Sequence, residues 1–265
     1  MKIARVLTIA GSDSSGGAGI QADLKTMTAL GAFGMSVVTA LTAQNTRGVQ
    51  GIYEVPADFV AKQFESVITD IGVDAVKTGM LTTAEIVTTV AGLIRKYGIQ
   101  KLVVDPVMAA KGGEALIKGD VKETLTRELI PLAFVATPNI PEAEILAETK
   151  IVDICDMENA ARIIYNLGAK NVLVKGGHLA GDAVDILYDG KQFYAFSAAR
   201  IAHGETHGTG CTYSAAIATL LAKGQNIAEA VKGAKAYMTE AIRCAWSTGV
   251  GYKLIHHLAP VLRAE

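Results

Sequence analysis

Short apolar segments alternate with amphipathic segments of helical length along most of this chain, and this alternation restricts the possible folds strongly. The apolar segments are nearly continuous runs rich in Val, Ile and Leu, which is typical of strands buried on both faces. Such strands, separated by helices, predict an α/β fold with a mostly parallel central sheet covered by helices on both faces. Strands are expected near 5–10, 37–41, 74–78, 101–106, 133–137 and 171–175, with a hairpin of 184–188 and 192–196. Helices are expected near 20–30, 58–70, 82–97, 120–130, 156–167, 208–223 and 226–247.

The bulk properties favour one domain that acts on small molecules. The chain has 265 residues and a formal net charge of -1, and no linker rich in proline, serine or charge divides it. We therefore expect a single domain over 1–265. A net charge this close to zero argues against a nucleic acid or a membrane surface as the main partner, so small neutral or acidic ligands are the better expectation.

Cysteine usage and hydropathy indicate where the protein works. Cys155, Cys211 and Cys244 are widely spaced and form no C-x-x-C pair, so neither a disulfide framework nor a cysteine zinc site is indicated. The apolar run at the start of the chain is too short for a signal peptide, and no apolar segment is long enough to span a membrane. The expected location is the cytoplasm.

Polar residues follow the expected strands at the points where the strands end. Ligands of parallel α/β sheets bind at the carboxyl ends of the strands, so we expect these residues to face one crevice. They are Gly11-Ser12-Asp13, Gln44-Asn45, Lys77-Thr78-Gly79-Met80, Asp105-Pro106-Val107, Thr137-Pro138-Asn139 and Lys175-Gly176-Gly177.

A glycine-rich loop that leads directly into a helix should form one wall of this crevice. The loop runs from His203 to Cys211, and the helix that follows is made of small and apolar residues. The free N–H groups from Gly208 to Cys211 and the helix dipole favour a phosphate or a developing oxyanion in front of the helix. The same field would lower the pKa of the Cys211 thiol and favours a reactive thiolate over a small buried apolar residue. The loop therefore has the features of a phosphoryl-transfer site.

Charged residues at three strand ends indicate how a phosphate could be held there. Asp105 could hold Mg²⁺, or it could be an ordinary solvated residue in a proline turn. Asn139 and Glu142 have the spacing of an N-cap and its capping-box acid, which would also place Glu142 where it could organise a magnesium-bound water. Lys175 precedes two glycines that would let a phosphate approach the backbone, whereas a solvated turn lysine is the simpler alternative. The presence of all three charges favours function.

The first glycine loop and the histidines are less specific. The loop Gly11 to Gly19 matches neither the Walker nor the Rossmann fingerprint, and a flexible turn would explain its glycines but not Asp13 and Asp23 beside them. The histidines show no metal-ligand pattern, so surface or packing positions are expected for most of them. The hairpin at 184–196 and the loop at 106–114 are candidates for lids.

Six motifs, in order over essentially the whole chain, resemble one enzyme family. They are AGSDSSGGAGIQADLKT at 10–26, VKTGM at 76–80, VDPVM at 104–108, TPNIPEAE at 137–144, VKGG at 174–177 and HGTGC at 207–211. Together they resemble the hydroxymethylpyrimidine/phosphomethylpyrimidine kinases of thiamine biosynthesis, which belong to the ribokinase-like superfamily.

The resemblance implies an ATP- and Mg²⁺-dependent kinase with a three-layer ribokinase-like fold, acting as a homodimer. Such an enzyme phosphorylates the hydroxymethyl group of 4-amino-5-hydroxymethyl-2-methylpyrimidine and then phosphorylates the monophosphate to the pyrophosphate. Many relatives have Asp at the position of Cys211. The resemblance implies that Cys211 activates the substrate hydroxyl, which matters less in the second step because its acceptor is already an ionised phosphate.

The resemblance also assigns roles to other residues. Gln44 is expected to read the ring, because its amide can accept from the exocyclic amine and donate to the adjacent ring nitrogen. Packing alone would also explain Met80 and Val107, although the thioether of Met80 would suit a ring face. The implied sets are Cys211, Gly208, Thr209 and Gly210 for catalysis, Gly11, Asp23, Gln44, Met80 and Val107 for the pyrimidine, Asn139, Lys175 and Thr206 for ATP, and Asp105 and Glu142 for Mg²⁺.

Two other functions fit the same residues. A pyridoxal kinase is the first alternative, because close relatives of this scaffold act on that vitamin and some act on both substrates. A protein that binds the pyrimidine without catalysis is the second, although a sensor would need no Gly-Thr-Gly-Cys loop, acid and lysine.

Overall fold

The computed structural model describes residues 3–108, 119–177, 179, 181–201 and 206–262. Within these residues, nine strands form one sheet in the order β3-β2-β1-β4-β5-β6-β7-β8-β9. The strands from β2 to β7 in this order run parallel, and antiparallel strands lie at both edges. They are β1 (Arg5–Asp13), β2 (Phe33–Asn45), β3 (Gly48–Glu54), β4 (Ala75–Thr78), β5 (Leu102–Val104), β6 (Val135–Ala136), β7 (Val172–Val174), β8 (Ala183–Tyr188) and β9 (Phe193–Ala198). The expected mostly parallel sheet is confirmed.

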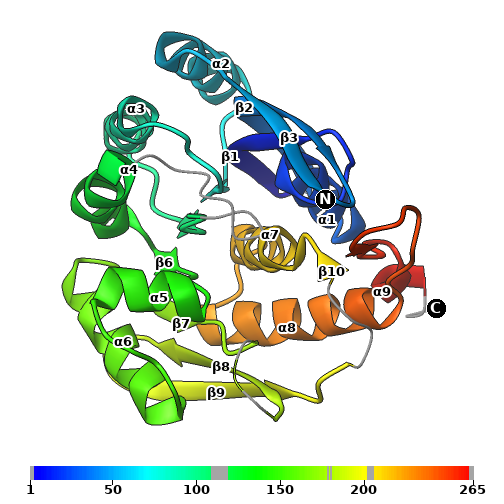
Figure 1. Cartoon of the computed structure of the whole chain (residues 1–265). Helices are drawn as coiled ribbons and strands as arrows, with labels where there is room; N and C mark the ends of the chain where they lie inside the picture. Colours follow the sequence, from blue (N-terminus) through cyan, green and yellow to red (C-terminus); the bar gives the residue numbers. More distant parts are fainter. Residues whose placement is uncertain (1–2, 109–118, 178, 180, 202–205, 263–265) are drawn as a thin grey trace.

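Helices cover both faces of the sheet and give the molecule three layers (Figure 1). Alternate strand residues point to opposite faces, so Leu7 and Ile9 pack with one group of helices while Val6 packs with the other. The first group contains α2 (Ala57–Asp70), α3 (Ala84–Lys96), α4 (Gly119–Thr124), α5 (Ile140–Ala147) and α6 (Ile154–Asn166), and the second contains α1 (Gly19–Ala29), α7 (Thr209–Ala222) and α8 (Ile227–Arg243). Both apolar cores are therefore closed by helices, as the continuous apolar strands predict.

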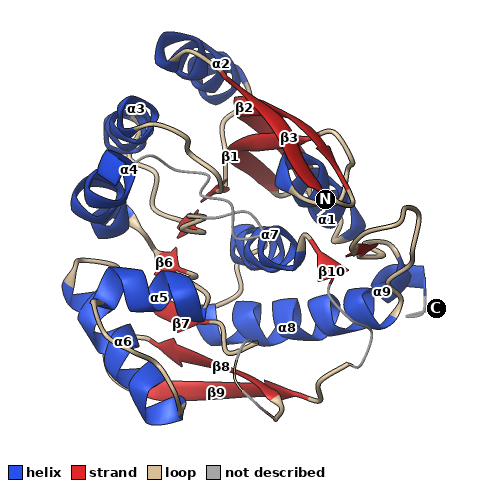
Figure 2. Ribbon diagram, in the orientation of Figure 1, coloured by secondary structure: helices blue, strands red, loops and turns tan. Residues whose placement is uncertain are grey.

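Helix α7 is buried along most of its length. It packs against strands β1, β4 and β5 on one side and against α1 and α8 on the other, near the middle of the view in Figure 2. Residues Thr212 to Leu221 are all buried, and the alanines among them let the helix approach the strands closely. Such a helix cannot shift without disturbing both neighbours, so its first turn is held firmly over the carboxyl ends of the strands.

The structure differs from the sequence-based prediction in three places. Strand β3 is missing from the prediction because its sequence, GVQGIYE, contains two glycines and lies almost entirely exposed at the sheet edge, where no apolar alternation is required. The helix expected near 120–130 is α4 followed by one π turn, Leu125–Leu129, and a 3₁₀ turn, Ile130–Leu132, which contains Pro131. The strand expected at 37–41 is the centre of a longer strand, β2.

The hairpin proposed as a lid is part of the main sheet. Strands β8 and β9 pair along their length at the sheet edge, and β8 also pairs with β7. The other proposed lid, the loop at 106–114, lies outside the described residues from 109 onward. The remaining elements are a small parallel pair, β10 (Thr206–His207) with β11 (Lys253–Leu254), and the short helix α9 (Ala259–Leu262). Among the described helices, none combines the length and the hydropathy needed to cross a membrane.

Candidate active site

The two glycine-rich loops of the sequence touch each other where α7 begins. Gly208 is the N-cap of α7 and has φ 85°. A Cβ atom on Gly208 would lie 1.8 Å from the carbonyl oxygen of Gly17, so only glycine allows this approach. As at every helix start, the first N–H groups of α7 have no intrahelical acceptor. Thr209 and Gly210 occupy this first turn, where the glycine loop enters the helix.

Cys211 follows in the same turn, but its thiol does not have the lowered pKa that the sequence predicts. The residue keeps some accessible surface, yet the protein packed around the thiol raises its pKa to about 11. The charge of Lys77 and the backbone N–H of Gly19 act in the opposite direction and are outweighed. Burial disfavours a thiolate more than the helix terminus and the lysine favour it. With this pKa, Cys211 is a neutral thiol at pH 7.

Asp105, Lys175 and Ser214 form a charged cluster under the first turn of α7. Lys175 Nζ donates to Asp105 Oδ1 at 2.8 Å, and Ser214 Oγ donates to Asp105 Oδ2 at 3.1 Å. Asp105 is only 2% exposed. Burial alone would raise the pKa of Asp105, but the charges of Lys175 and Lys77 hold it below its ordinary value. A Cβ atom on Gly210 would lie 3.6 Å from both Asp105 Oδ2 and Lys175 Nζ, so this cluster lies directly against the glycine turn.

Asn139 and Glu142 form the capping box that the sequence predicts at the start of α5. The Asn139 N–H donates to Glu142 Oε2 at 2.8 Å, and the Glu142 N–H donates to Asn139 Oδ1 at 2.9 Å. Glu142 is buried, and burial raises its pKa to about 7, with Lys175 opposing the shift and the charge of Asp105 adding to it. The capping role is confirmed, and the second carboxylate lies within electrostatic reach of the Asp105–Lys175 pair.

This donor set suits a magnesium ion that is bound together with phosphate. Asp105 and Glu142 supply carboxylate oxygens, and both lie within electrostatic reach of Lys175. In the described part of the chain, no group of three or more His, Cys, Asp or Glu residues could hold a metal alone. Mg²⁺ typically takes one or two carboxylates and completes its coordination with water and substrate phosphates, so the residues fit that ion in that mode.

The other expected nucleotide and pocket residues lie around this centre. Thr206 is 9% exposed, and its hydroxyl lies 3.1 Å from the hydroxyl of Thr209. Met80 packs on Gly11 so closely that a Cβ atom there would be 2.3 Å from the Met80 methyl group. Val107 is partly exposed, and its N–H bonds to the Asp105 carbonyl oxygen at 2.8 Å, which turns the chain sharply after the carboxylate.

Asp23 does not line a crevice, in contrast to the expectation from the resemblance. It is fully buried on α1 and accepts hydrogen bonds from Lys77 Nζ at 2.8 and 3.0 Å and from the Thr8 hydroxyl at 2.6 Å. Lys77 is equally buried. Burial alone would lower the pKa of Lys77, but the charges of Asp23 and Asp105 raise it above its ordinary value. The sequence feature that could have indicated this pair is Lys77, which is the charged residue in the short buried strand Ala75–Thr78.

Gln44 lies in a hydrogen-bonded chain that the sequence does not reveal. One end of its side-chain amide lies 2.9 Å from His207 Nε2, and the same His207 atom lies 2.9 Å from Asp13 Oδ2. The side chain of His207 is only 12% exposed, so this histidine does not lie on the surface. His257 does fit a packing role, because it is 7% exposed and contacts Thr212. His178 and His203 lie outside the described residues.

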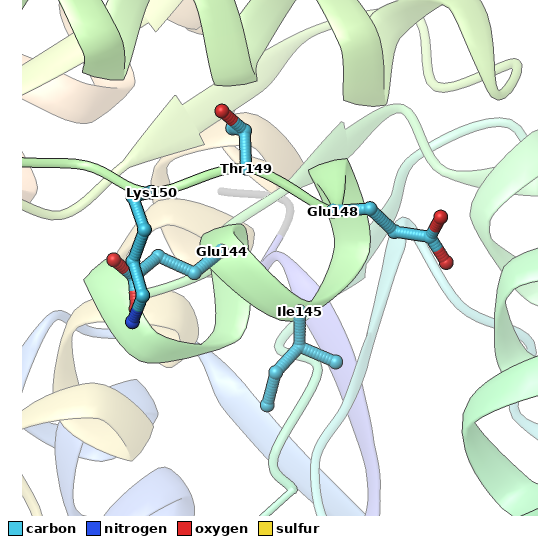
Figure 3. A pocket seen from close by; sticks show the side chains of 5 residues that line it. All are labelled: Glu144, Ile145, Glu148, Thr149 and Lys150. Atoms are coloured by element: carbon cyan, nitrogen blue, oxygen red, sulfur yellow. The ribbon is translucent and has the colours of Figure 1, made fainter.

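A separate shallow hollow lies on the outer side of α5 (Figure 3). It is lined by Glu144, Ile145, Glu148, Thr149 and Lys150, at the end of the helix and in the loop that follows. None of the residues expected for catalysis, substrate, nucleotide or metal lines it, so the strand-end cluster remains the candidate active site.

Comparison with known sequences identifies the family of the chain. The family model described as phosphomethylpyrimidine kinase matches residues 13–256. The chain is 56% identical over 254 residues to the thiamine biosynthesis bifunctional protein ThiED of Geobacter sulfurreducens, covering 96% of this chain and 52% of that protein, or about half its length. It is 51% identical over 252 residues to the hydroxymethylpyrimidine/phosphomethylpyrimidine kinase of Streptomyces coelicolor, covering 95% and 93% of the two chains.

Structural comparison finds a close match among vitamin kinases. The ADP complex of Bacillus subtilis pyridoxal kinase has a TM-score of 0.91 and 38% sequence identity, and the match covers 100% of both chains. The expected three-layer ribokinase-like fold is thereby confirmed. Since the family model spans most of the chain and the relatives are this similar, the chain belongs to the phosphomethylpyrimidine kinase family, as its motifs predict.

Proposed function

We propose that this protein is an ATP-dependent kinase of thiamine biosynthesis with two successive activities. It phosphorylates the hydroxymethyl group of 4-amino-5-hydroxymethyl-2-methylpyrimidine and then the resulting monophosphate, which gives the pyrophosphate. The observation that carries the proposal is the Asp105–Lys175 pair, lying directly against the glycine turn that opens α7 with Cys211 beside it. This combination of an anion-binding helix start, a lysine and buried carboxylates suits phosphoryl transfer.

The charged cluster would hold and align the nucleotide. Lys175 and the first N–H groups of α7 would contact the phosphate oxygens, with Thr206 and Asn139 at the edges of that site. Magnesium would be held by Asp105 and Glu142 and would neutralise phosphate charge when bound. The loose transition state of phosphoryl transfer needs alignment and charge stabilisation more than covalent help, so rigid placement of these groups is their main contribution.

The pyrimidine would bind between the Gly11–Met80 contact and Gln44. The Met80 methyl that packs on Gly11 would offer an apolar contact to a ring, and the Gln44 amide would offer one donor and one acceptor to an aminopyrimidine edge. Cys211 would take the hydroxyl proton in the first step. Asp23 is not proposed to touch the substrate, because it is fully enclosed.

A pyridoxal kinase is the alternative that a specific observation favours. The pyridoxal kinase of Bacillus subtilis matches the whole chain at a TM-score of 0.91. The family model and the relatives of higher identity favour the pyrimidine. A sensor without catalysis is disfavoured, because a binding protein would have no use for the Asp105, Lys175 and Cys211 set.

One experiment separates these possibilities. ADP formation is measured with purified protein, Mg²⁺ and ATP, side by side with the hydroxymethylpyrimidine, its monophosphate and pyridoxal. We expect turnover of both pyrimidines with a higher kcat/KM than that of pyridoxal. A higher kcat/KM for pyridoxal would establish the alternative, and pyrimidine binding without ADP formation would establish the sensor. Omission of Mg²⁺ should abolish turnover, which tests the metal assignment.

We further propose a cytoplasmic homodimer. Leu41 and Tyr53 lie opposite each other on β2 and β3 and are 49% and 69% exposed, which is unusual for large apolar side chains on an edge hairpin and suits a subunit interface. Sedimentation of the purified protein, compared with Tyr53→Lys, tests the association. A monomeric wild-type protein would contradict it.

A further inference from the structure

His207 joins two segments that lie far apart in the sequence. His207 lies within the second glycine loop, and its ring packs on the first loop, since a Cβ atom on Gly17 would lie 2.8 Å from His207 Cδ2. His207 Nε2 lies 2.9 Å from Asp13 Oδ2 and 2.9 Å from the side-chain amide of Gln44. All three side chains are at least partly buried, so the contacts are shielded from competing water.

The hydrogen-bond partners of Asp13 determine where the His207 proton lies. Asp13 Oδ1 accepts from the N–H and hydroxyl of Ser15, and Oδ2 accepts from the N–H of Ala18. Although burial alone would raise its pKa, the hydrogen bonds from His207 and Ser15 lower the pKa of Asp13 to about 2. A carboxylate accepts only, so His207 Nε2 carries a hydrogen whether the ring is neutral or charged.

This hydrogen decides which atom of the Gln44 amide faces His207. An amide NH₂ group at 2.9 Å would point its own hydrogens at a nitrogen that already carries one, whereas an amide oxygen could share the Nε2 hydrogen with Asp13 in a three-centre hydrogen bond. Amide nitrogen and oxygen differ little in shape, so their assignment follows from the hydrogen-bond network. The network therefore requires the amide oxygen on the His207 side.

Thr42 leads independently to the same orientation. Its hydroxyl lies 2.9 Å from the Ser12 carbonyl oxygen and 3.1 Å from the other end of the Gln44 amide. A carbonyl oxygen has no hydrogen to give, so the single Thr42 hydrogen goes to Ser12 and the Thr42 oxygen is left to accept. The amide atom that faces Thr42 is then the nitrogen.

We propose that Asp13 and His207 are positioning residues that fix the side-chain amide of Gln44 with its oxygen toward His207 and its nitrogen toward Thr42. The inference rests on the proposed ring-reading role of Gln44. In this orientation, one lone pair and one N–H of the amide remain for the substrate in a fixed order along its edge. An aminopyrimidine, which presents an amine donor beside a ring-nitrogen acceptor, matches that order.

The fixed amide would act against pyridoxal as well as for the pyrimidine. Pyridoxal has no amine donor beside its ring nitrogen, so it would not match the fixed order of the amide oxygen and nitrogen. An amide free to flip would accept either ligand. His207 and Asp13 therefore set the substrate preference through Gln44, without touching the substrate themselves.

A double-mutant cycle between His207 and Gln44 tests the inference. The four proteins are wild type, His207→Phe, Gln44→Leu and the double variant. Phe keeps a ring beside Gly17 but removes both nitrogen contacts. We expect His207→Phe to raise the KM for the hydroxymethylpyrimidine about tenfold, a coupling of roughly 1.4 kcal/mol, and to reduce the preference over pyridoxal. In the Gln44→Leu background, the same change should have almost no effect on either quantity.

The outcomes separate this inference from the proposed function. Equal effects of His207→Phe in both backgrounds would overturn the inference, because the histidine would then act independently of the amide. If Gln44→Leu leaves the pyrimidine KM unchanged, the ring-reading role fails and the inference fails with it. Thr42→Val provides a second variant, which releases the amide from its other side and should likewise reduce the substrate preference only while Gln44 is present. Thermal melting of each variant verifies that it is folded.

Discussion

Replacing Lys77 by Met removes an ammonium group that the protein encloses completely and leaves the Asp23 carboxylate behind. Both side chains are 0% exposed, and Lys77 Nζ lies 2.8 and 3.0 Å from the two carboxylate oxygens. After the change, the Thr8 hydroxyl would be the remaining hydrogen-bond donor to Asp23 among the side-chain contacts described above. A single neutral hydrogen bond does not replace the lost charge.

The expected cost follows from this burial. Removal of one partner from a buried ion pair typically destabilises a protein by about 3–5 kcal/mol, because the other charge stays buried without compensation. For a chain of this size, each kcal/mol corresponds to about 2–4 °C in Tm. Lys77→Met should therefore lower the melting temperature by roughly 10 °C, even though no predicted substrate contact is removed.

Urea unfolding and thermal melting provide the assay, with a matched control. Lys62 also pairs with an aspartate, Asp58, at 2.9 Å, but the two side chains are 67% and 70% exposed. Lys62→Met should leave the melting temperature unchanged within error, because solvent screens such a pair. The double variant Asp23→Leu and Lys77→Met should regain part of the loss, since an apolar pair can replace a buried ion pair.

The same measurements decide between two roles for Asp23. If Asp23 contacts the pyrimidine, Asp23→Asn should weaken substrate binding and leave stability nearly intact. If it is the structural partner of Lys77, stability should fall and the KM of the folded protein should change little. A Lys77→Met variant that unfolds within about 1 kcal/mol of wild type would refute the reasoning from burial.

Two further substitutions test other parts of the site. Gly208→Ala should destabilise the protein by more than about 1 kcal/mol and reduce turnover, because φ is 85° and the new Cβ would lie 1.8 Å from a backbone oxygen. Gly224→Ala is the control. Its φ is 92° and no atom lies within 4 Å of the new Cβ, so this change should cost only the backbone strain. Lys235→Met should destabilise by about 3–5 kcal/mol, because Lys235 is 5% exposed and pairs with buried Asp185 at 2.6 Å; urea unfolding unchanged from wild type would contradict this.

Local sequence was sufficient for the features that depend on neighbouring residues. The capping box of Asn139 and Glu142 spans only three residues, so its spacing predicts its geometry. The start of α7 at Gly208 is equally local. The general rule that parallel strands end at one edge then brings Asp105 and Lys175 together, although they are 70 residues apart in the sequence. Such features follow from periodicity and topology alone.

Other features depend on contacts that no local pattern encodes. Asp23 meets Lys77 across 54 residues, and His207 meets Asp13 across 194, so neither pair leaves a spacing signal. The pKa of Cys211 is raised, whereas the sequence predicts a lowered pKa, for a related reason. A helix terminus can be recognised in the sequence, but the amount of protein packed around one thiol cannot, and that packing gives the larger effect.

The raised pKa of Cys211 also leads to a prediction about the two reactions. A thiol with a pKa of about 11 is almost entirely protonated at pH 7, so it can accept a proton only in its rare thiolate form. If Cys211 is the base for the alcohol, the kcat of that step should rise about tenfold per pH unit from pH 7 to 9. The phosphate acceptor of the second step is already ionised, so its kcat should stay nearly flat.

Rapid-quench measurements of each step across this range, with wild type and Cys211→Ala, test this assignment. The variant should lose the rise in the alcohol step and retain most of the phosphate step. Parallel profiles for both steps would show that Cys211 is not the base. A rise that levels off near pH 7 would instead mean that binding of substrate and MgATP lowers the pKa of the thiol, since a ligand that favours the thiolate must shift its ionisation.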